Sequence, residues 1–223
     1  GSITEFMRID SSGGGLVGIG TNSPSTKLHV YQASGNTALR VESAATNAQA
    51  SINFKNDARR YDVGINSSDT FFISDDTASS TRLAIDSTGA VTMPSQPAFM
   101  AYANEQADIA VGANVNVVFA NERFDQNADF DGTSTFTAPV TGRYQLNASI
   151  YLLGVDTASA YYYLELQTSN ELYYNIIDST EFNADLNYWT FTLSHLVDMD
   201  ASDTAVCRIL QANGTSQTHI NAN

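Results

Sequence analysis

The sequence predicts an all-β protein in two parts, a slender β-rich shaft or connector followed by a β-sandwich head. Short apolar runs of about five residues are separated by turn-forming Gly, Ser, Asn and Asp through the first part. In the second part, Tyr144–Leu152 alternates apolar and polar residues, as a half-buried strand does. No stretch of helical periodicity competes with the strands of the second part.

The first part holds a series of segments with strand character. Strands this short bury little apolar surface alone, so stacked repeats or intertwined copies of the chain would have to supply a core. An alanine-rich stretch, residues 44–50, would form one or two helical turns. The strand segments are Lys27–Tyr31, Ala38–Glu42, Ser51–Lys55, Tyr61–Ile65 and Thr70–Ser74.

An internal repeat links the two ends of this first part. Met7–Gly13 matches Leu83–Gly89, because in both an apolar strand end meets Asp-Ser-(Ser/Thr)-Gly. The glycine of such a turn is free to take a positive φ. Both copies then return to an apolar pair, Leu16-Val17 in one and Ala90-Val91 in the other. The repeat therefore predicts the same strand–turn–strand unit twice.

The second part continues as strands at regular spacing. Many strands with about 10 to 15 residues between their starts are typical of a sandwich or jelly roll. The apolar residues of Tyr144–Leu152 share one face of the strand and the polar residues mostly share the other. The predicted strands are Val115–Phe119, Tyr144–Leu152, Tyr161–Gln167, Leu172–Ile177, Tyr188–Val197 and Thr204–Gln211.

Composition excludes several classes of function. The chain has 223 residues, a formal net charge of −14 and only 15% charged residues. This acidic balance argues against nucleic-acid binding, which needs a basic face, and against docking on anionic lipid. No stretch approaches about 18 consecutive apolar residues, so no membrane insertion is predicted. The single cysteine, Cys207, excludes an intrachain disulfide framework.

The charge also divides the chain. Residues 1–94 carry 7 basic and 9 acidic residues, whereas residues 95–223 carry 3 basic and 15 acidic ones. Pro94 and Pro97 flank the change, and such a proline pair disfavours a continuing regular element. We place a domain boundary there, with the shaft or connector at residues 3–93 and the head at residues 97–223.

Several segments of the first part carry a family resemblance. Met7–Gly13 reads MRIDSSG, Val17–Pro24 reads VGIGTNSP and Lys27–Val30 reads KLHV. Together they resemble the RIDSSG, VGIGT-x-SP and KLHV run of bacteriophage tail fibres, and Phe71–Asp75 with Arg82–Asp86 is similar to a segment that recurs before that run. The resemblance implies a fibrous protein of the virion and brings no catalytic residue. Related segments also occur in cellular surface proteins.

The second part carries another resemblance. Phe136–Tyr144 reads FTAPVTGRY, and Phe119, Asp125 and Phe130 precede it. These residues resemble the F-T-A-P-x-x-G-x-Y core of the C1q/TNF-like jelly roll. The sequence departs from the family pattern at two places. The spacing from Phe130 to Phe136 is one residue short, and the aliphatic Leu146 and Ala148 stand where aromatic residues are usual.

A third departure concerns the last strand. The family closes with a strand of the type F-F-S-G-x-L, and no such strand occurs before Asn223. An empty place in the sheet would leave backbone groups of two neighbouring strands unpaired. We therefore expect a further segment beyond Asn223, or, as alternatives, a detached C-terminal piece, a segment from a neighbouring chain, or use of Gln217–Asn221 as the last strand.

The resemblance implies a homotrimer with aromatic and aliphatic residues at its axis. Tyr161 and Tyr163 share one face of an alternating strand, while Tyr162 points to the other. Adjacent aromatics therefore cannot all enter one core. We expect some of them at a subunit interface or a ligand surface, stacking on a sugar ring being one alternative.

Residues for chemistry are sparse. HExxH, HxxEH and CxxC spacings are absent, which argues against zinc, and no G-x-S-x-G elbow occurs. His195 and Cys207 lie within predicted strands and are read as structural. No cofactor and no catalytic residue is predicted, but a Ca²⁺ site stays open as an alternative. Its ligands would be Asp125, Asp129 and Asp131, or Asp198, Asp200 and Asp203.

The two resemblances imply a phage tail-fibre receptor-binding protein, a homotrimeric knob that adheres to the bacterial host surface without chemistry. The expected partner is a cell-surface glycan or protein, and the expected location is the tail fibre of the virion. One alternative is a tail fibre that degrades host polysaccharide, because the distance between the paired carboxylates that cleave a glycosidic bond cannot be deduced from a sequence. The other alternative is a cellular C1q-like adhesin or lectin.

The receptor surface is predicted on loops at the outer end of the head, because recognition residues concentrate on loops held by a rigid scaffold. The chosen loops are residues 156–160, 168–171 and 179–186, all rich in small polar residues between strong strands. The predicted receptor contacts are Asp156, Thr157, Ser159, Thr168, Ser169, Asn170, Asn183 and Asp185.

Overall fold

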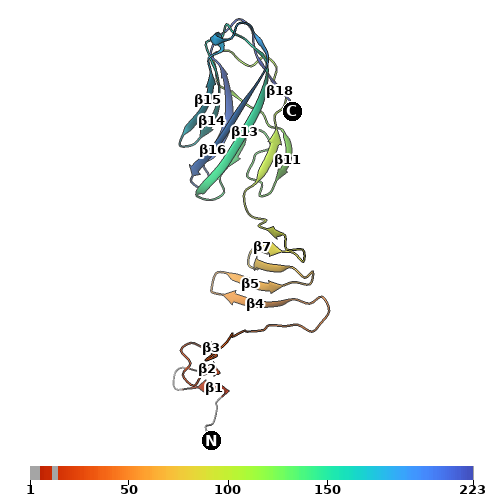
Figure 1. The fold of residues 1–223 in the computed structure, drawn as a ribbon, viewed down its shortest axis with the longest axis vertical. Helices are drawn as coiled ribbons and strands as arrows, with labels where there is room; N and C mark the ends of the chain where they lie inside the picture. The colour runs from red at the N-terminus through yellow and green to blue at the C-terminus, as the bar shows by residue number, and fades with distance from the viewer. Residues whose placement is uncertain (1–5, 12–14, 223) are drawn as a thin grey trace. The chain divides into compact units, whose positions relative to one another are not determined.

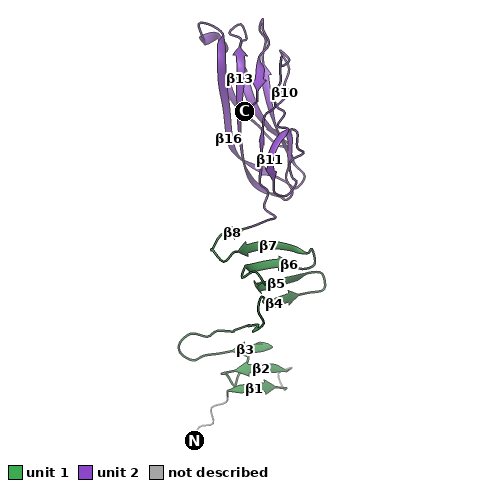
Figure 2. Cartoon of the chain, turned by 90° about the vertical axis from the view of Figure 1, so that its right-hand side faces the viewer, with its two compact units in different colours: residues 1–92 green, residues 93–223 purple. Residues whose placement is uncertain are grey.

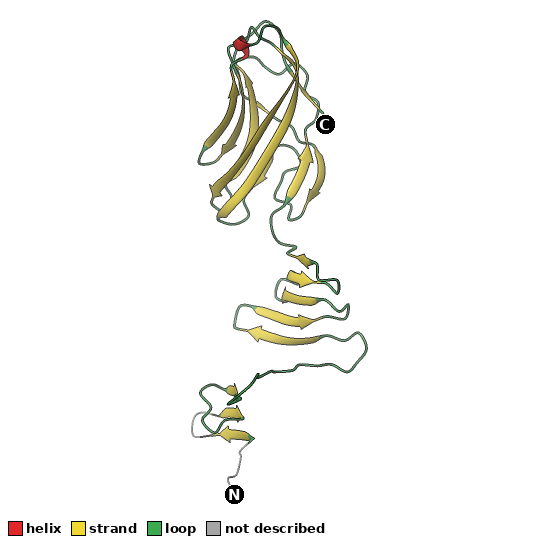
Figure 3. Ribbon diagram, in the orientation of Figure 1, coloured by secondary structure: helices red, strands yellow, loops and turns green. Residues whose placement is uncertain are grey.

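The computed structural model describes residues 6–11 and 15–222 of the chain. The chain forms two compact units, Gly1–Thr92 and Met93–Asn223, which Figure 2 shows in green and purple. Strands make up nearly all regular structure, as Figure 3 shows, and the one helical turn in the described ranges is η1 (Ser179–Glu181). No helix among the described residues is long and apolar enough to cross a membrane. The predicted all-β class is confirmed.

Unit 1 begins with a small sheet of order β1-β2-β3. β1 (Met7–Asp10) pairs antiparallel with β2 (Leu16–Ile19), and β2 pairs parallel with β3 (Leu28–Val30). The first copy of the repeat thus forms a strand–turn–strand unit, although Ser12 and Gly13 of its turn lie outside the described residues.

A second sheet follows as an antiparallel meander (Figure 1). Its last turn is the second copy of the repeat: the Asp86 carboxylate accepts hydrogen bonds from the backbone N–H of Thr88 and Ala90, and Gly89 takes φ +92°. The strands, in their order in the sheet, are β4 (Ala50–Lys55), β5 (Arg60–Ile65), β6 (Phe71–Asp75), β7 (Ser80–Ile85) and β8 (Val91–Thr92).

Between the two sheets the sequence prediction fails twice. The predicted strand Ala38–Glu42 is not formed, and residues 45–47 make a bend and a turn in place of the helical turns predicted for residues 44–50. Leu39 and Val41, the apolar residues of the predicted strand, are exposed. An apolar alternation alone does not make a strand, because a strand also needs a neighbour to hydrogen-bond.

Unit 1 buries very little. Phe72 is its single buried hydrophobic side chain in the described residues, and the buried Asp75 carboxylate pairs with Arg59 and Arg82 at 2.6 and 3.0 Å. Many large apolar side chains of its strands are exposed instead, and they include Met7, Ile9, Ile19, Leu28, Ile52, Phe54, Tyr61, Ile65, Phe71 and Val91.

Unit 2 is a β-sandwich. One sheet contains, in order, β10 (Val115–Asn116), β17 (Thr204–Gln211), β14 (Tyr162–Thr168) and β15 (Leu172–Ile177), with β12 (Thr135–Thr137) also paired with β17. The facing sheet has the order β16-β13-β18, built from β16 (Leu186–Met199), β13 (Gly142–Val155) and β18 (His219–Asn221). β9 (Phe99–Tyr102) and β11 (Asn121–Asp125) pair with each other beside these sheets (Figure 1).

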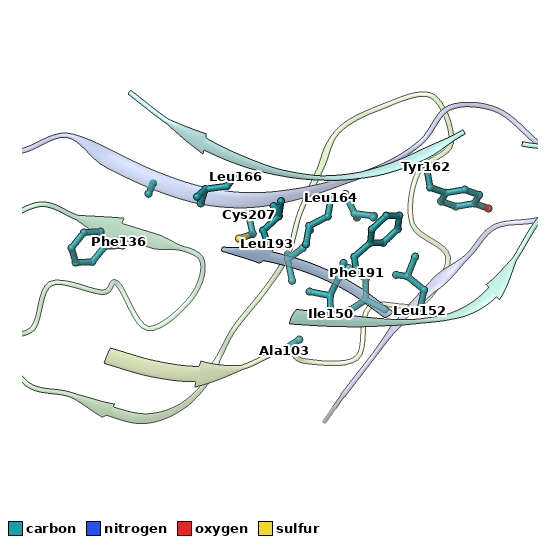
Figure 4. Packing of buried hydrophobic residues seen from close by; sticks show 14 of the residues in the cluster. Ala103, Phe136, Ile150, Leu152, Tyr162, Leu164, Leu166, Phe191, Leu193 and Cys207 are labelled. Atoms are coloured by element: carbon teal, nitrogen blue, oxygen red, sulfur yellow. The ribbon is translucent and has the colours of Figure 1, made fainter. Parts of the chain in front are cut away.

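The core lies between the two sheets of unit 2 (Figure 4). The alternating pattern of β13 puts Ile150 and Leu152 into it, where they meet Leu164 of β14 and Phe191 of β16. The predicted split of the tyrosines is confirmed, because Tyr162 is fully buried while Tyr161 and Tyr163 stack on the other face, with ring centroids 6.2 Å apart.

The last described strand is formed by the end of the chain. β18 pairs antiparallel with Tyr151–Leu153 of β13, and on its other edge Ile220 exchanges two 2.9 Å backbone hydrogen bonds with Gln106. Of the arrangements expected for the closing strand, the structure thus contains the one that uses residues within 217–221.

Candidate functional site

Two of the three predicted receptor loops meet at one end of unit 2. The backbone N–H and hydroxyl of Thr157 both donate to the Asp185 carboxylate, at 2.9 and 2.7 Å, and Ser179 donates to the carbonyl oxygen of Ser159 at 2.5 Å. The connection between β17 and β18 joins them, since the Ala160 N–H donates to the Asn213 side chain at 2.6 Å. We use the name outer end only as a label for this cluster of unit 2, which comprises residues 156–160, 178–185 and 212–217.

The third predicted loop lies elsewhere. Residues 168–171 turn at the opposite end of β14, where Ser169 N–H donates to the carbonyl oxygen of Thr204 at 2.9 Å and the Asn170 amide donates to Asp203 at 2.7 Å. The prediction of one surface containing Thr168, Ser169 and Asn170 with the other contacts is therefore wrong. Successive antiparallel strands place their connecting loops at alternate ends of a sheet, so neighbouring loops in the sequence are far apart in space.

Three of the eight predicted contacts have buried side chains. Asp156, Ser159 and Thr168 are buried, so as side chains they are not available to a receptor, and the prediction is corrected for them. The Thr168 hydroxyl accepts from the N–H groups of Asn170 and Glu171 and closes its own turn. Ser159 donates to the carbonyl oxygen of Tyr161. Small polar residues in a loop satisfy backbone groups as readily as they face solvent.

Asp156 anchors the outer end. The residue is 2% exposed, and its carboxylate accepts hydrogen bonds from the backbone N–H groups of Ala158, Thr215 and Ser216, at 2.8, 2.5 and 2.8 Å. Burial acts to raise its pKa, but these N–H groups and the Thr215 hydroxyl outweigh burial and hold the pKa below its ordinary value. The carboxylate is therefore ionised at neutral pH and ties two loops together.

A buried polar network continues below Asp156. Tyr162 accepts from the Asp156 N–H at 2.9 Å and shares a 2.8 Å hydrogen bond with the Thr218 hydroxyl, which donates to the Gly154 carbonyl oxygen. Gln211 accepts from the Thr218 N–H and donates to the Ser216 carbonyl oxygen. Burial raises the pKa of Tyr162, so the phenol stays protonated. A satisfied buried network of this kind makes loops rigid.

The exposed part of the outer end differs from the predicted list. Thr157, Asn183 and Asp185 remain at its surface, and the segment 213–216 joins them. Sequence reasoning missed this segment, although Asn213-Gly214 is a strong turn signal. Gly214 takes φ +136°, and a Cβ there would come within 2.5 Å of the Asp156 carboxylate oxygen, so only glycine fits beside the anchor.

An exposed aromatic pair lies beside the outer end. Tyr188 of β16 and Tyr151 of β13 stack with ring centroids 5.6 Å apart on the outward face of their sheet. Tyr188 is 64% exposed and is the third residue of the strand that leaves the outer end. Its ring offers a flat apolar surface next to hydrogen-bonding loops.

A second aromatic surface covers the outward face of the other sheet. Tyr163 packs edge-on to Tyr174 at 5.1 Å and stacks on Tyr161. Beneath these rings Arg208 donates to the buried Glu165 carboxylate, with Nε 2.6 Å from the oxygen. Leu172 and Ile176 of the edge strand β15 extend the surface and are exposed. We call this apolar and aromatic area the tyrosine face.

The candidate Ca²⁺ ligands are engaged in turns. Asp125 accepts from the N–H groups of Asp129 and Phe130, and Asp131 accepts from those of Thr133, Ser134 and Thr135. Of Asp198, Asp200 and Asp203, Asp203 accepts from the Asp200 N–H and from the Asn170 amide. Across residues 6–11 and 15–222 no group of three or more His, Cys, Asp or Glu is placed to hold a metal ion, so neither alternative set comes together.

The remaining candidates for chemistry are dispersed. His195 stacks on Tyr173 with centroids 4.6 Å apart, His29 lies edge-on to Tyr31, and His219 accepts the Asp108 N–H at 2.9 Å. Burial raises the pKa of Cys207 to about 12, so its thiolate is scarce at neutral pH.

Comparisons with known proteins find similarities among solved structures. No family model matches the chain, and no curated protein matches it. Among solved structures, the chain is similar to the globular domain of zebrafish complement 1qA protein, at 18% identity and a TM-score of 0.41, covering 56% of this chain and 93% of that one. A second similarity, to an exo-β-1,3-galactanase from Phanerochaete chrysosporium, has 8% identity and a TM-score of 0.19, covering 79% of this chain and 44% of that one.

Proposed function

We propose that this chain is the receptor-binding part of a phage tail fibre, a homotrimer whose head binds a glycan or protein of the bacterial surface without covalent chemistry. The observation that carries the proposal is the outer end, where exposed polar side chains stand on a buried and fully hydrogen-bonded base. A preorganised surface of this kind loses little conformational freedom on binding.

Assembly into a homotrimer is supported by unit 1. Its strands expose large apolar side chains on a chain that buries a single one, Phe72, among the described residues. Such strands gain stability only when other chains cover them, and burial of apolar area is the dominant favourable term in association. In unit 2 the tyrosine face offers a further contact area.

A trimer with three equal heads can hold a bacterial surface firmly even when each single site binds weakly. Once one head has bound, the other two are held near the same surface at high effective concentration, so avidity exceeds the affinity of each site. Assignment to a tail fibre of the virion rests on the resemblance of residues 7–30 and 71–86 to that family. The excess of carboxylates in unit 2 favours a receptor that is neutral or cationic.

Adsorption measurements test this function. Purified protein is incubated with intact bacteria and with their isolated surface polysaccharide, and free protein is measured after removal of the cells. Asn183→Arg combined with Thr157→Arg should abolish adsorption while leaving the mass in light scattering unchanged. The matched control, Asn170→Arg at the opposite end of the same unit, should adsorb like the parent.

Two results would contradict the proposal. One is unchanged adsorption of the outer-end variant together with loss in the Asn170→Arg control, which would move the contact surface. The other is release of reducing sugar from the polysaccharide, which would show chemistry rather than binding alone.

A further inference from the structure

The connection between the two sheets of unit 1 contains a segment without a backbone partner. Residues 31–49 follow β3 and precede β4, and all of them are exposed. No backbone hydrogen bond in the described ranges joins residues 32–49 to the rest of the chain. Positive φ occurs in this connection at Gly35 and Asn47, and residues 36–44 contain neither a turn nor a bend. Connections of this length without regular structure are uncommon in compact units and are usually functional or linkers.

Within this connection, Ala38–Glu42 keeps the two-sided pattern of a strand. Leu39 and Val41 are 64% and 46% exposed. They alternate with Arg40 and Glu42, whose guanidinium and carboxylate groups are 2.5 Å apart, so the two charged side chains lie on one side of the segment. The segment therefore offers an apolar side, a charged side and unpaired backbone groups, and it lacks only a neighbouring strand.

β4 has a free edge of the matching kind. It pairs with β5 on one edge and is the last strand of its sheet on the other, and its six residues make it the longest edge strand in the described part of unit 1. Ile52 and Phe54 share the apolar face of the sheet with Val63 of β5. Asn53 points to the opposite, polar face, where its amide donates to Asp62. An unpaired edge of this kind is a template for another strand.

The two faces and the charges together define a register. Both faces match when Leu39 lies beside Ile52, because apolar and polar residues then alternate in step on the two strands. A strand that runs parallel to β4 in this register places Glu42 beside Lys55, and opposite charges on neighbouring strands attract. An antiparallel strand that sets its two apolar residues beside Ile52 and Phe54 puts Glu42 at the other end of β4, away from Lys55.

The chain cannot make this parallel pairing with its own β4. Parallel neighbours need a crossover connection of about a dozen or more residues, whereas only residues 43–49 lie between the segment and β4. An antiparallel hairpin of the same chain would be within reach of that connection, yet the chain does not form one. A second copy of the chain carries the same segment without this restriction.

We propose that Ala38–Glu42 of one copy adds as a parallel strand to the free edge of β4 in a neighbouring copy. This inference rests on the homotrimer of the proposed function and names the strand that its chains exchange. Leu39 and Val41 extend the apolar face of the neighbour's sheet, and the charged residues extend its polar face. Each copy donates one strand and accepts one at a different surface, and such a heterologous contact closes as a ring, as in a cyclic trimer.

The first test is a disulfide between copies. Ala38→Cys combined with Ser51→Cys places two thiols beside each other on the polar face in the proposed register. After mild oxidation, electrophoresis without reductant should show covalent dimers and trimers. Ala38→Cys combined with Lys55→Cys is the matched control at the other end of β4 and should cross-link far less. The parent chain, whose Cys207 is buried, should not cross-link.

Amide exchange of the assembled parent chain is the second measurement. Residues 38–42 should exchange about tenfold or more slowly than residues 32–36 of the same connection. The two stretches are equally exposed and unpaired in the single chain, so a difference between them reports the added strand. Light scattering of the same sample gives the number of chains in the assembly.

The outcomes separate the strand exchange from the homotrimer. A trimer without cross-links, in which residues 38–42 exchange as fast as residues 32–36, would overturn the exchange and leave the homotrimer intact. A disulfide within one chain, or one formed preferentially by the Lys55→Cys control, would also overturn it. Protection that appears only after bacterial polysaccharide is added would show that a receptor, not a second copy, covers the segment. A monomer would contradict the homotrimer and the exchange together.

Discussion

The two units use the same kind of strand and differ in where the apolar side chains go. In unit 2 two sheets face each other, and residues such as Ile150 and Phe191 are completely buried between them. In unit 1 each sheet is single, and Phe72 alone is buried among its described apolar residues. A sheet with no second layer cannot bury a face, so within one chain the first unit has no core of its own and the second has one.

Breaking the assembly should therefore affect the two units very differently, and this is the largest expected effect. Light scattering at micromolar concentration should give about three times the chain mass of 24.0 kDa. On dilution below the dissociation range, amide protons of β4–β7 should lose protection completely, while those of β14 and β17 keep it. A monomer with protected amides in both units would contradict the comparison.

Matched truncations of one apolar side chain in each unit should sharpen the contrast. Leu152→Ala in unit 2 removes a fully buried side chain and should lower the free energy of unfolding by about 2–5 kcal/mol, independently of protein concentration. Phe54→Ala in unit 1 removes a side chain that is 59% exposed in the single chain. It should weaken assembly, so its transition should shift with concentration.

The opposite result for Phe54 would be informative. If Phe54→Ala changed neither mass nor melting at any concentration, the exposed face of β4 would not be part of a subunit contact. The measurement is thermal unfolding followed by circular dichroism over a hundredfold range of concentration, compared with the parent chain.

The anchor of the outer end gives a smaller and pH-dependent effect. The pKa of Asp156 is held below its usual value by backbone N–H donors although burial opposes this, so its stabilising effect is fully present above about pH 3.8 and is lost as the pH falls through the lower folded-state pKa. Asp156→Ala leaves buried N–H groups of Thr215 and Ser216 without an acceptor and should cost about 3 kcal/mol at pH 7.

Its control is Asp156→Asn, which keeps an acceptor oxygen and removes the charge. This variant should lose less stability at pH 7, and the difference between parent and Asp156→Asn should shrink as the pH is lowered through the acid range. Melting temperatures measured between pH 7 and pH 2 check both expectations. A constant difference across that range would show that the carboxylate charge is not involved.

The sequence predicted what depends on neighbours along the chain. The alternation of Tyr144–Leu152 and of Tyr161–Tyr163 reports which side chains enter the core, because successive residues of a strand point to opposite faces. The predicted loops were misplaced in space because the 168–171 turn reverses the chain at the other end of β14. The burial of Asp156 depends on Thr215 and Ser216, about sixty residues later, and no local pattern reports such a contact.

The smallest expected effect concerns the exposed ring beside the outer end. If a sugar of the receptor stacks on Tyr188, Tyr188→Ala should weaken adsorption by up to about tenfold, since an aromatic contact contributes roughly 0.5–1.5 kcal/mol beyond its buried area. The stability of the Tyr188→Ala variant should hardly differ from that of the parent, because the Tyr188 side chain is 64% exposed. Leu196→Ala is the matched control, a side chain 62% exposed on the same outward face of β16 but opposite Gln145, far from the outer end. If the two variants adsorb equally, the Tyr188–Tyr151 pair does not contact the receptor. If adsorption is weaker only in Tyr188→Ala, the receptor site includes this part of β16 as well as the loops.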